Sequence, residues 1–107
     1  MMETKKMMHD NVVFITKEIA APAADAAETA YQTLNKIENE LNCQRSSKYN
    51  ILKINVYVPD LTCWHSMESG YQKFFGSYQP VNQVIPCDTN NHISFEVIAQ
   101  KDSYFAN

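Results

Sequence analysis

The chain has 107 residues, enough for one domain with a modest hydrophobic core. Apolar residues make up 45% of it and charged residues 20%, as is usual for a globular protein in water. The net charge of -3 and the single arginine, Arg45, offer no cluster of cations for phosphate groups, so we expect no nucleic-acid partner.

The three cysteines, Cys43, Cys63 and Cys87, are widely spaced and odd in number. This favours free thiols in a reducing compartment over disulfides. No apolar run is long enough for a signal peptide or a membrane span, so we expect a cytoplasmic protein without a membrane partner. Cys63 and His65 do not have the spacing of a zinc site, and there is no glycine-rich phosphate loop. We therefore expect no metal and no cofactor.

In chain order, residues 1–10 are expected to fray or to form an edge strand. The segment Asn11–Ile19 is rich in β-branched and aromatic residues, which predicts a strand. A connector, Ala20–Asp25, follows it. Apolar residues then recur at helical spacing, which predicts a helix from about Ala26 to Asn42 with one apolar face.

The second half begins with an alternating strand at Ile51–Asp60. An aromatic helix follows at Thr62–Phe75, and two further strands are expected at Asn82–Cys87 and His92–Gln100. Gly70 lies inside the second helix, where glycine lowers helix propensity, and we expect it to mark close packing against the sheet.

The element order β-α-β-α-β-β predicts a single α+β domain over residues 1–107: a two-layer sandwich of a mixed sheet with two helices on one face. The last two strands flank the polar turn Asp88–Asn91, which we expect to close a hairpin. The uncovered sheet face needs apolar cover, and we expect Val56, Val58 and Val84 to supply its apolar area. That need argues for assembly with other chains.

Four short sequence motifs follow one another in the second half: V-P-D at Val58–Asp60, F-F at Phe74–Phe75, P-V-N at Pro80–Asn82 and E-V-I-A at Glu96–Ala99. They resemble the RidA/YjgF family of imine deaminases, whose members have V-x-D, F-F, P-A-R and E-x-E-x-I-A in this order. The resemblance extends over about Val12–Gln100. It implies the chorismate-mutase-like form of the sandwich, a homotrimer, and a small-molecule metabolite bound in clefts between neighbouring chains.

The resemblance also implies roles for particular residues. Glu96 has the position of the glutamate that orients and activates the attacking water, so we expect it to be the catalytic residue. Asn82 replaces the arginine that holds the carboxylate of the imino acid. Asparagine has no charge, and losing a charged partner in a desolvated site costs roughly 2–5 kcal/mol. The backbone amide that also binds substrate in the family belongs here to Val84.

A second part of the implied substrate site comes from the segment Phe14–Ile19. Thr16 has the position of a family serine. Lys17 has the position of a glycine whose carbonyl helps to bind the attacking water. The Lys17 side chain would either crowd the cleft and change its charge or replace the charge lost at Asn82.

Three functions remain open at this point. The favoured one is a diverged RidA-like protein with a small-molecule cleft between subunits, without efficient 2-imino acid deaminase activity because of Asn82, and with Glu96 left to act on a neutral or cationic substrate. The second is an active imine/enamine deaminase, a hydrolase, in which Lys17 or a neighbouring chain binds the carboxylate. The third is a non-catalytic trimeric binding or interaction protein.

Overall fold

The computed structural model describes residues 11–102, so the prediction for residues 1–10 lies outside the described residues. The elements in chain order are β1 (Val12–Ala20), α2 (Ala26–Cys43), the short 3-10 helix η1 (Lys48–Asn50), β2 (Ile51–Val58), α3 (Leu61–Phe75), β3 (Val81–Pro86) and β4 (His92–Gln100). The order of strands and helices confirms the sequence prediction.

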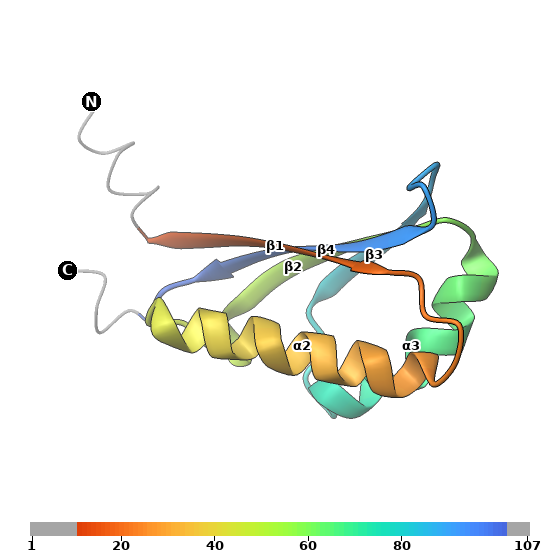
Figure 1. Cartoon of the computed structure of the whole chain (residues 1–107). Coiled ribbons are helices and arrows are strands. Elements are labelled where there is room, and N and C mark those ends of the chain that lie inside the picture. Colours follow the sequence, from red (N-terminus) through yellow and green to blue (C-terminus); the bar gives the residue numbers. More distant parts are fainter. Residues whose placement is uncertain (1–10, 103–107) are drawn as a thin grey trace.

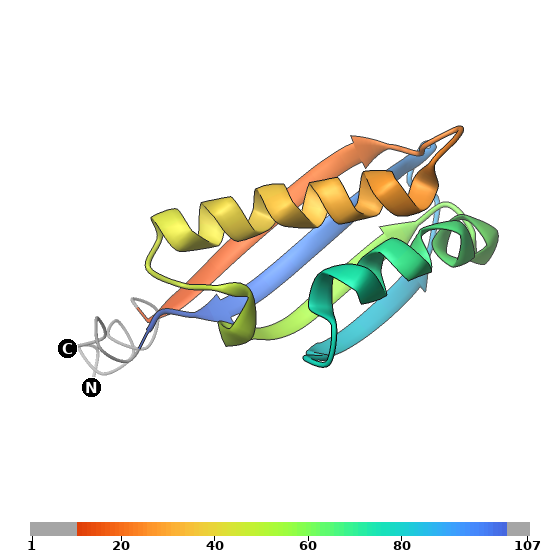
Figure 2. The same cartoon turned by 90° about the horizontal axis from the view of Figure 1, so that it is seen from below.

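The four strands form one sheet in the order β1-β4-β2-β3 (Figure 2). Strand β4 runs antiparallel to both of its neighbours, whereas β2 and β3 are parallel and are connected through α3. The sheet is therefore mixed, as predicted. The predicted hairpin is wrong, because β3 and β4 do not pair. Alternate residues of β4 are fully buried, which suits a central strand, whereas β3 ends at Pro86 and lies at the edge.

Both helices cover the same face of the sheet, which confirms the two-layer α+β architecture (Figures 1 and 2). Each helix buries one stripe of side chains at the spacing of an amphipathic helix. The core residues of α2 are Ala30, Leu34, Ile37 and Leu41, and those of α3 include Trp64, Met67, Tyr71 and Phe74. The sheet contributes alternate residues of its strands to this core.

The apolar residues expected on the open face of the sheet face the helices instead. Val56 and Val58 are 0% exposed, and Val84 packs against the same core. Side chains alternate along a strand, so burying these valines turns Asn55 and Tyr57 to the other face. The prediction that these valines lie on the open face was therefore wrong, and that face is more polar than predicted.

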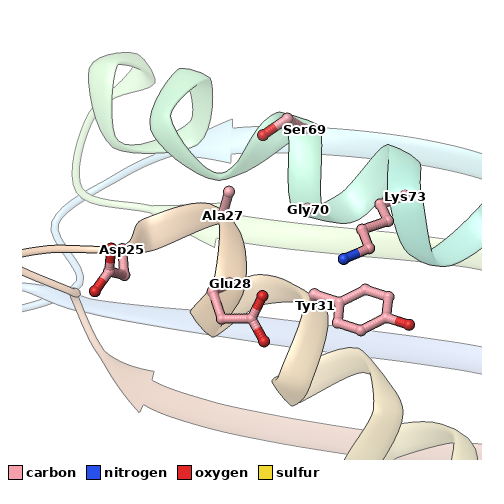
Figure 3. Close-up of a pocket in the computed structure, with 7 residues that line it drawn as sticks. All are labelled: Asp25, Ala27, Glu28, Tyr31, Ser69, Gly70 and Lys73. Atoms are coloured by element: carbon pink, nitrogen blue, oxygen red, sulfur yellow. The ribbon is translucent and has the colours of Figure 1, made fainter.

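Gly70 marks a close approach between the two helices. A Cβ atom built at Gly70 would lie 1.8 Å from the carbonyl oxygen of Ala27 in α2 (Figure 3). We expected Gly70 to allow close packing of α3 against the sheet. That expectation is wrong, because the glycine allows α3 to approach α2 instead.

We predict that Gly70→Ala lowers the melting temperature of the protein. Glycine to alanine within a helix normally gains about 1 kcal/mol, but overpacking at this contact costs about 1–3 kcal/mol. Each lost kcal/mol lowers the melting temperature of a domain of this size by about 4–8 °C. As a control, Gln72→Ala, at an exposed position of the same helix, should change stability by less than about 0.5 kcal/mol. Thermal denaturation measures both, and a more stable Gly70→Ala protein would contradict the close contact.

Candidate functional site

One row of polar residues crosses all four strands on the open face of the sheet. The strand register aligns Thr16 of β1, Glu96 of β4, Asn55 of β2 and Gln83 of β3. Phe95 and Val97, on either side of Glu96, are fully buried toward the helices. Because side chains alternate along a strand, Glu96 and the rest of its row point away from the helices.

Glu96 accepts two hydrogen bonds at the same carboxylate oxygen. The side-chain amide of Asn55 donates from Nδ2 to Oε1 over 2.8 Å, and the hydroxyl of Tyr57 donates to Oε1 over 3.1 Å. Neither Asn55 nor Tyr57 was among the site residues predicted from the sequence. The sequence of β2 could have indicated them, because a polar residue and a tyrosine alternate with buried Ile and Val side chains along this strand.

Asn55 is an unusual residue for a central strand. It is only 9% exposed, and among residues 11–102 its Oδ1 atom has no hydrogen-bond partner. The amide orientation follows from its neighbour, because turning the amide over would place Oδ1 against the Glu96 carboxylate, acceptor against acceptor. Burying a polar atom without a partner costs free energy, so Asn55 is held in this position at the expense of stability.

Tyr57 is tied electrostatically to Glu96. The hydrogen bond to Glu96 raises the pKa of Tyr57 above its ordinary value of 10.0, and partial burial and the negative charge of Glu96 raise this pKa further. Deprotonation would remove the hydroxyl donor and place two negative charges together. The stabilisation from this contact is therefore complete below the ordinary pKa and is lost as the pH rises through the raised one.

We predict that Tyr57 titrates above pH 10.0 and that Glu96→Gln lowers its pKa, because the substitution removes the negative charge. Ultraviolet titration of tyrosine absorbance measures this, with the Tyr57→Phe spectrum subtracted to isolate Tyr57. As a control, Glu28→Gln, which removes a negative charge from α2, should leave the Tyr57 pKa unchanged. A Tyr57 pKa at or below 10, or one that does not change in Glu96→Gln, would contradict the contact.

The structure does not bring Asn82 to Glu96 within one chain. Asn82 is in register with Ile54, a core residue, so its side chain lies on the helix-covered face of β3. Strands β3 and β4 are also two strand spacings apart, roughly 10 Å. A site that uses both residues therefore requires the edge of β3 from another chain.

Val84 lies on the same edge strand as Asn82. The N–H of Cys87 donates to the carbonyl of Val58 over 2.9 Å, so that amide points toward β2. Amides alternate in direction along a strand, so the N–H of Val84 points to the free edge of the sheet. The geometry leaves this amide available to a ligand or to another chain at that edge.

The two positions in β1 lie on opposite faces of the sheet. Thr16 pairs with Glu96 across the strands and shares its open face. Lys17 lies on the helix side, where its ammonium group forms an ion pair with the carboxylate of Glu40 in α2. Within one chain the Lys17 side chain therefore does not approach Glu96 or replace a charge beside it.

A groove between α2 and α3 is a separate hollow on the helix side of the molecule (Figure 3). The Lys73 ammonium group lies 4.5 Å from the centre of the Tyr31 ring, and Glu28 accepts a hydrogen bond from Gln32. None of the residues predicted for the site from sequence lines this groove. Gly70, at the close contact of the two helices, is among the residues that line this groove.

Within residues 11–102 no three His, Cys, Asp or Glu side chains gather in a way that could hold a metal ion. All three cysteines are free thiols; Cys43 and Cys87 are exposed and Cys63 is partly buried. Neither of the helices described there is long and apolar enough to cross a membrane.

Comparison with known proteins agrees with the fold and the sequence motifs. A family model described as Endoribonuclease L-PSP matches residues 5–100. Protein HMF1 of Saccharomyces cerevisiae is 24% identical over 85 residues, a match that covers 74% of this chain and 66% of the length of the yeast protein.

Two solved structures illustrate the similarity of the fold. The structure of yeast Mmf1 has 25% sequence identity and a TM-score of 0.74, and the match covers 86% of this chain and 81% of Mmf1. For the YjgF gene product of E. coli the identity is 21% and the TM-score 0.69, with 86% and 82% of the two chains covered. Because the family model matches most of the sequence and the fold is that of YjgF, the chain belongs to the RidA/YjgF family.

Proposed function

We propose that this protein is a diverged RidA-like homotrimer that binds a small-molecule metabolite in clefts between subunits and lacks efficient 2-imino acid deaminase activity. The observation that carries the proposal is the arrangement of Glu96 and Asn82. Glu96, which the resemblance assigns to the catalytic carboxylate, is oriented on the open face, whereas Asn82, which the resemblance assigns to the arginine position, is an uncharged side chain at the sheet edge. We further propose that it acts in the cytoplasm.

The open face of the sheet supports the trimer. A row next to that of Glu96 contains Phe14, Ile98, Lys53 and Val81 in register. Phe14 is 65% exposed and Val81 is 67% exposed in the single chain. Exposed apolar side chains at both edges of one uncovered sheet face favour burial against other copies.

We predict that light scattering during size-exclusion chromatography gives the mass of about three chains. Phe14→Glu should reduce that mass to one chain, because a charge would be buried at the interface. Leu61→Glu is the matched control: Leu61 is also exposed but begins α3, away from the open face, so the trimer should persist. A wild-type monomer at all concentrations would contradict the shared cleft.

The exchange at Asn82 supports a substrate other than the imino acids of the family. An arginine binds a carboxylate through two parallel charged hydrogen bonds, which asparagine cannot form. The Lys17 ammonium group, the alternative cation, pairs with Glu40 on the other side of the sheet. A neutral or cationic substrate for hydrolysis at Glu96 fits this distribution of charge better than an anionic one.

We predict that 2-iminopropanoate generated in solution decays at close to the buffer rate in the presence of the wild-type protein. Asn82→Arg should increase the protein-dependent rate by at least about tenfold, because it restores the charged partner of the carboxylate. Gln72→Arg, which places the same charge on the exposed surface of α3, should not. Decay is followed by trapping the remaining imine with semicarbazide.

Robust wild-type turnover would contradict this proposal and favour an active imine/enamine deaminase, and Lys17→Ala would then test the substitute cation. If neither the wild-type protein nor Asn82→Arg turns over the imine, and no small molecule binds, a non-catalytic trimeric interaction protein is the better description. The family description names an endoribonuclease, but a net charge of -3 does not favour binding to RNA.

A further inference from the structure

We propose that Asn55 and Tyr57 are positioning residues that hold one oxygen of Glu96 and so restrict this site to cationic ligands that donate hydrogen bonds, such as an amidine, rather than carboxylates. This inference rests on the proposed function, because it assumes that the open face of the sheet is a ligand site. It goes further in naming the chemical class of the ligand and two residues that select it.

The two donors fix the carboxylate. Asn55 and Tyr57 come from the same strand, β2, and both donate to Oε1 of Glu96 on the neighbouring strand. Within residues 11–102 the hydrogen bonds to Glu96 therefore engage Oε1 and leave Oε2 for a further donor. A carboxylate held at one oxygen presents the other in a defined direction, which is what a ligand-orienting acceptor requires.

Asn55 carries a second acceptor, its own amide oxygen. Oδ1 of Asn55 is buried and has no donor among the described residues, and the bond from Nδ2 to Glu96 fixes its orientation. The site thus combines a carboxylate oxygen and an amide oxygen that both lack a donor. A positively charged N–H donor satisfies the Glu96 oxygen that lacks a donor, whereas a carboxylate would add a further acceptor next to it.

The charges around this pair agree with a cationic ligand. Lys53 lies on the open face in the row on one side of Glu96, and Glu18 lies in the row on the other side. These two charges are opposite in sign, so the carboxylate of Glu96 sets the net negative charge of the face. Thr16, its neighbour in β1, is uncharged.

The test uses three probes of the same size and shape: acetamidinium, acetamide and acetate. Each is titrated into the isotope-labelled full chain in its solution assembly, and the backbone amide signals of Glu96, Asn55 and Tyr57 are followed by nuclear magnetic resonance. Acetamidinium should bind most tightly, acetamide more weakly, and acetate should leave these signals unchanged. Glu96→Gln should abolish the preference, and Glu18→Gln, which removes the same charge from the same face, should preserve it.

The two positioning residues are tested by Tyr57→Phe and Asn55→Leu. Each should weaken acetamidinium binding by about threefold to tenfold and reduce the difference between the probes. Tyr49→Phe, a change at an exposed tyrosine outside the open face, should have no effect. Tyr57→Phe removes a single hydroxyl from a partly exposed side chain, so it carries the test if Asn55→Leu fails to fold.

Each contrary result identifies which step is wrong. Tightest binding of acetate at the same signals would overturn the donor preference and leave the small-molecule site in place. Wild-type binding by both Tyr57→Phe and Asn55→Leu would overturn the positioning role. If none of the three probes perturbs the open-face signals, the small-molecule site itself is absent, and the proposed function fails together with this inference.

Discussion

The placement of β4 at the centre of the sheet, antiparallel to β1 and β2, is the constraint on which the rest of the structure depends. The odd-numbered residues of β4, such as Phe95 and Val97, form the floor of the core beneath the helices. Their burial forces the even-numbered residues onto the other face. A shift of the register by one residue would bury Glu96 and expose the core, so the register that stabilises the fold also sets the position of the carboxylate.

The same constraint separates the residues of the proposed site within one chain. Two helices satisfy only one face of the sheet, and the other face presents Glu96 with its donors Asn55 and Tyr57 between exposed apolar side chains. The Val84 amide and the Asn82 side chain lie at the β3 edge and not beside Glu96. Assembly through the open face and the strand edges is the arrangement that would unite them.

The sequence predicted the elements, the mixed sheet and the single helix layer because periodicity and short motifs are local signals. It predicted the wrong pairing for the last two strands, since β3 and β4 are neighbours in sequence but β4 lies between β1 and β2. It found Glu96 by resemblance to the family and missed Asn55 and Tyr57, whose role depends on the register between β2 and β4. The face of the sheet on which Lys17 lies was not predicted either, because its ion pair with Glu40 depends on how α2 packs against the sheet.

The central claim is that the open face is covered by other copies of the chain and that Glu96 lies in the resulting cleft. A crystal structure of the assembled protein tests it most directly. The account predicts three copies packed through their open sheet faces, with Glu96 of each copy facing the free β3 edge of a neighbour. A structure in which Glu96 and Phe14 contact only bulk solvent, or in which the copies meet through their helices, would contradict it.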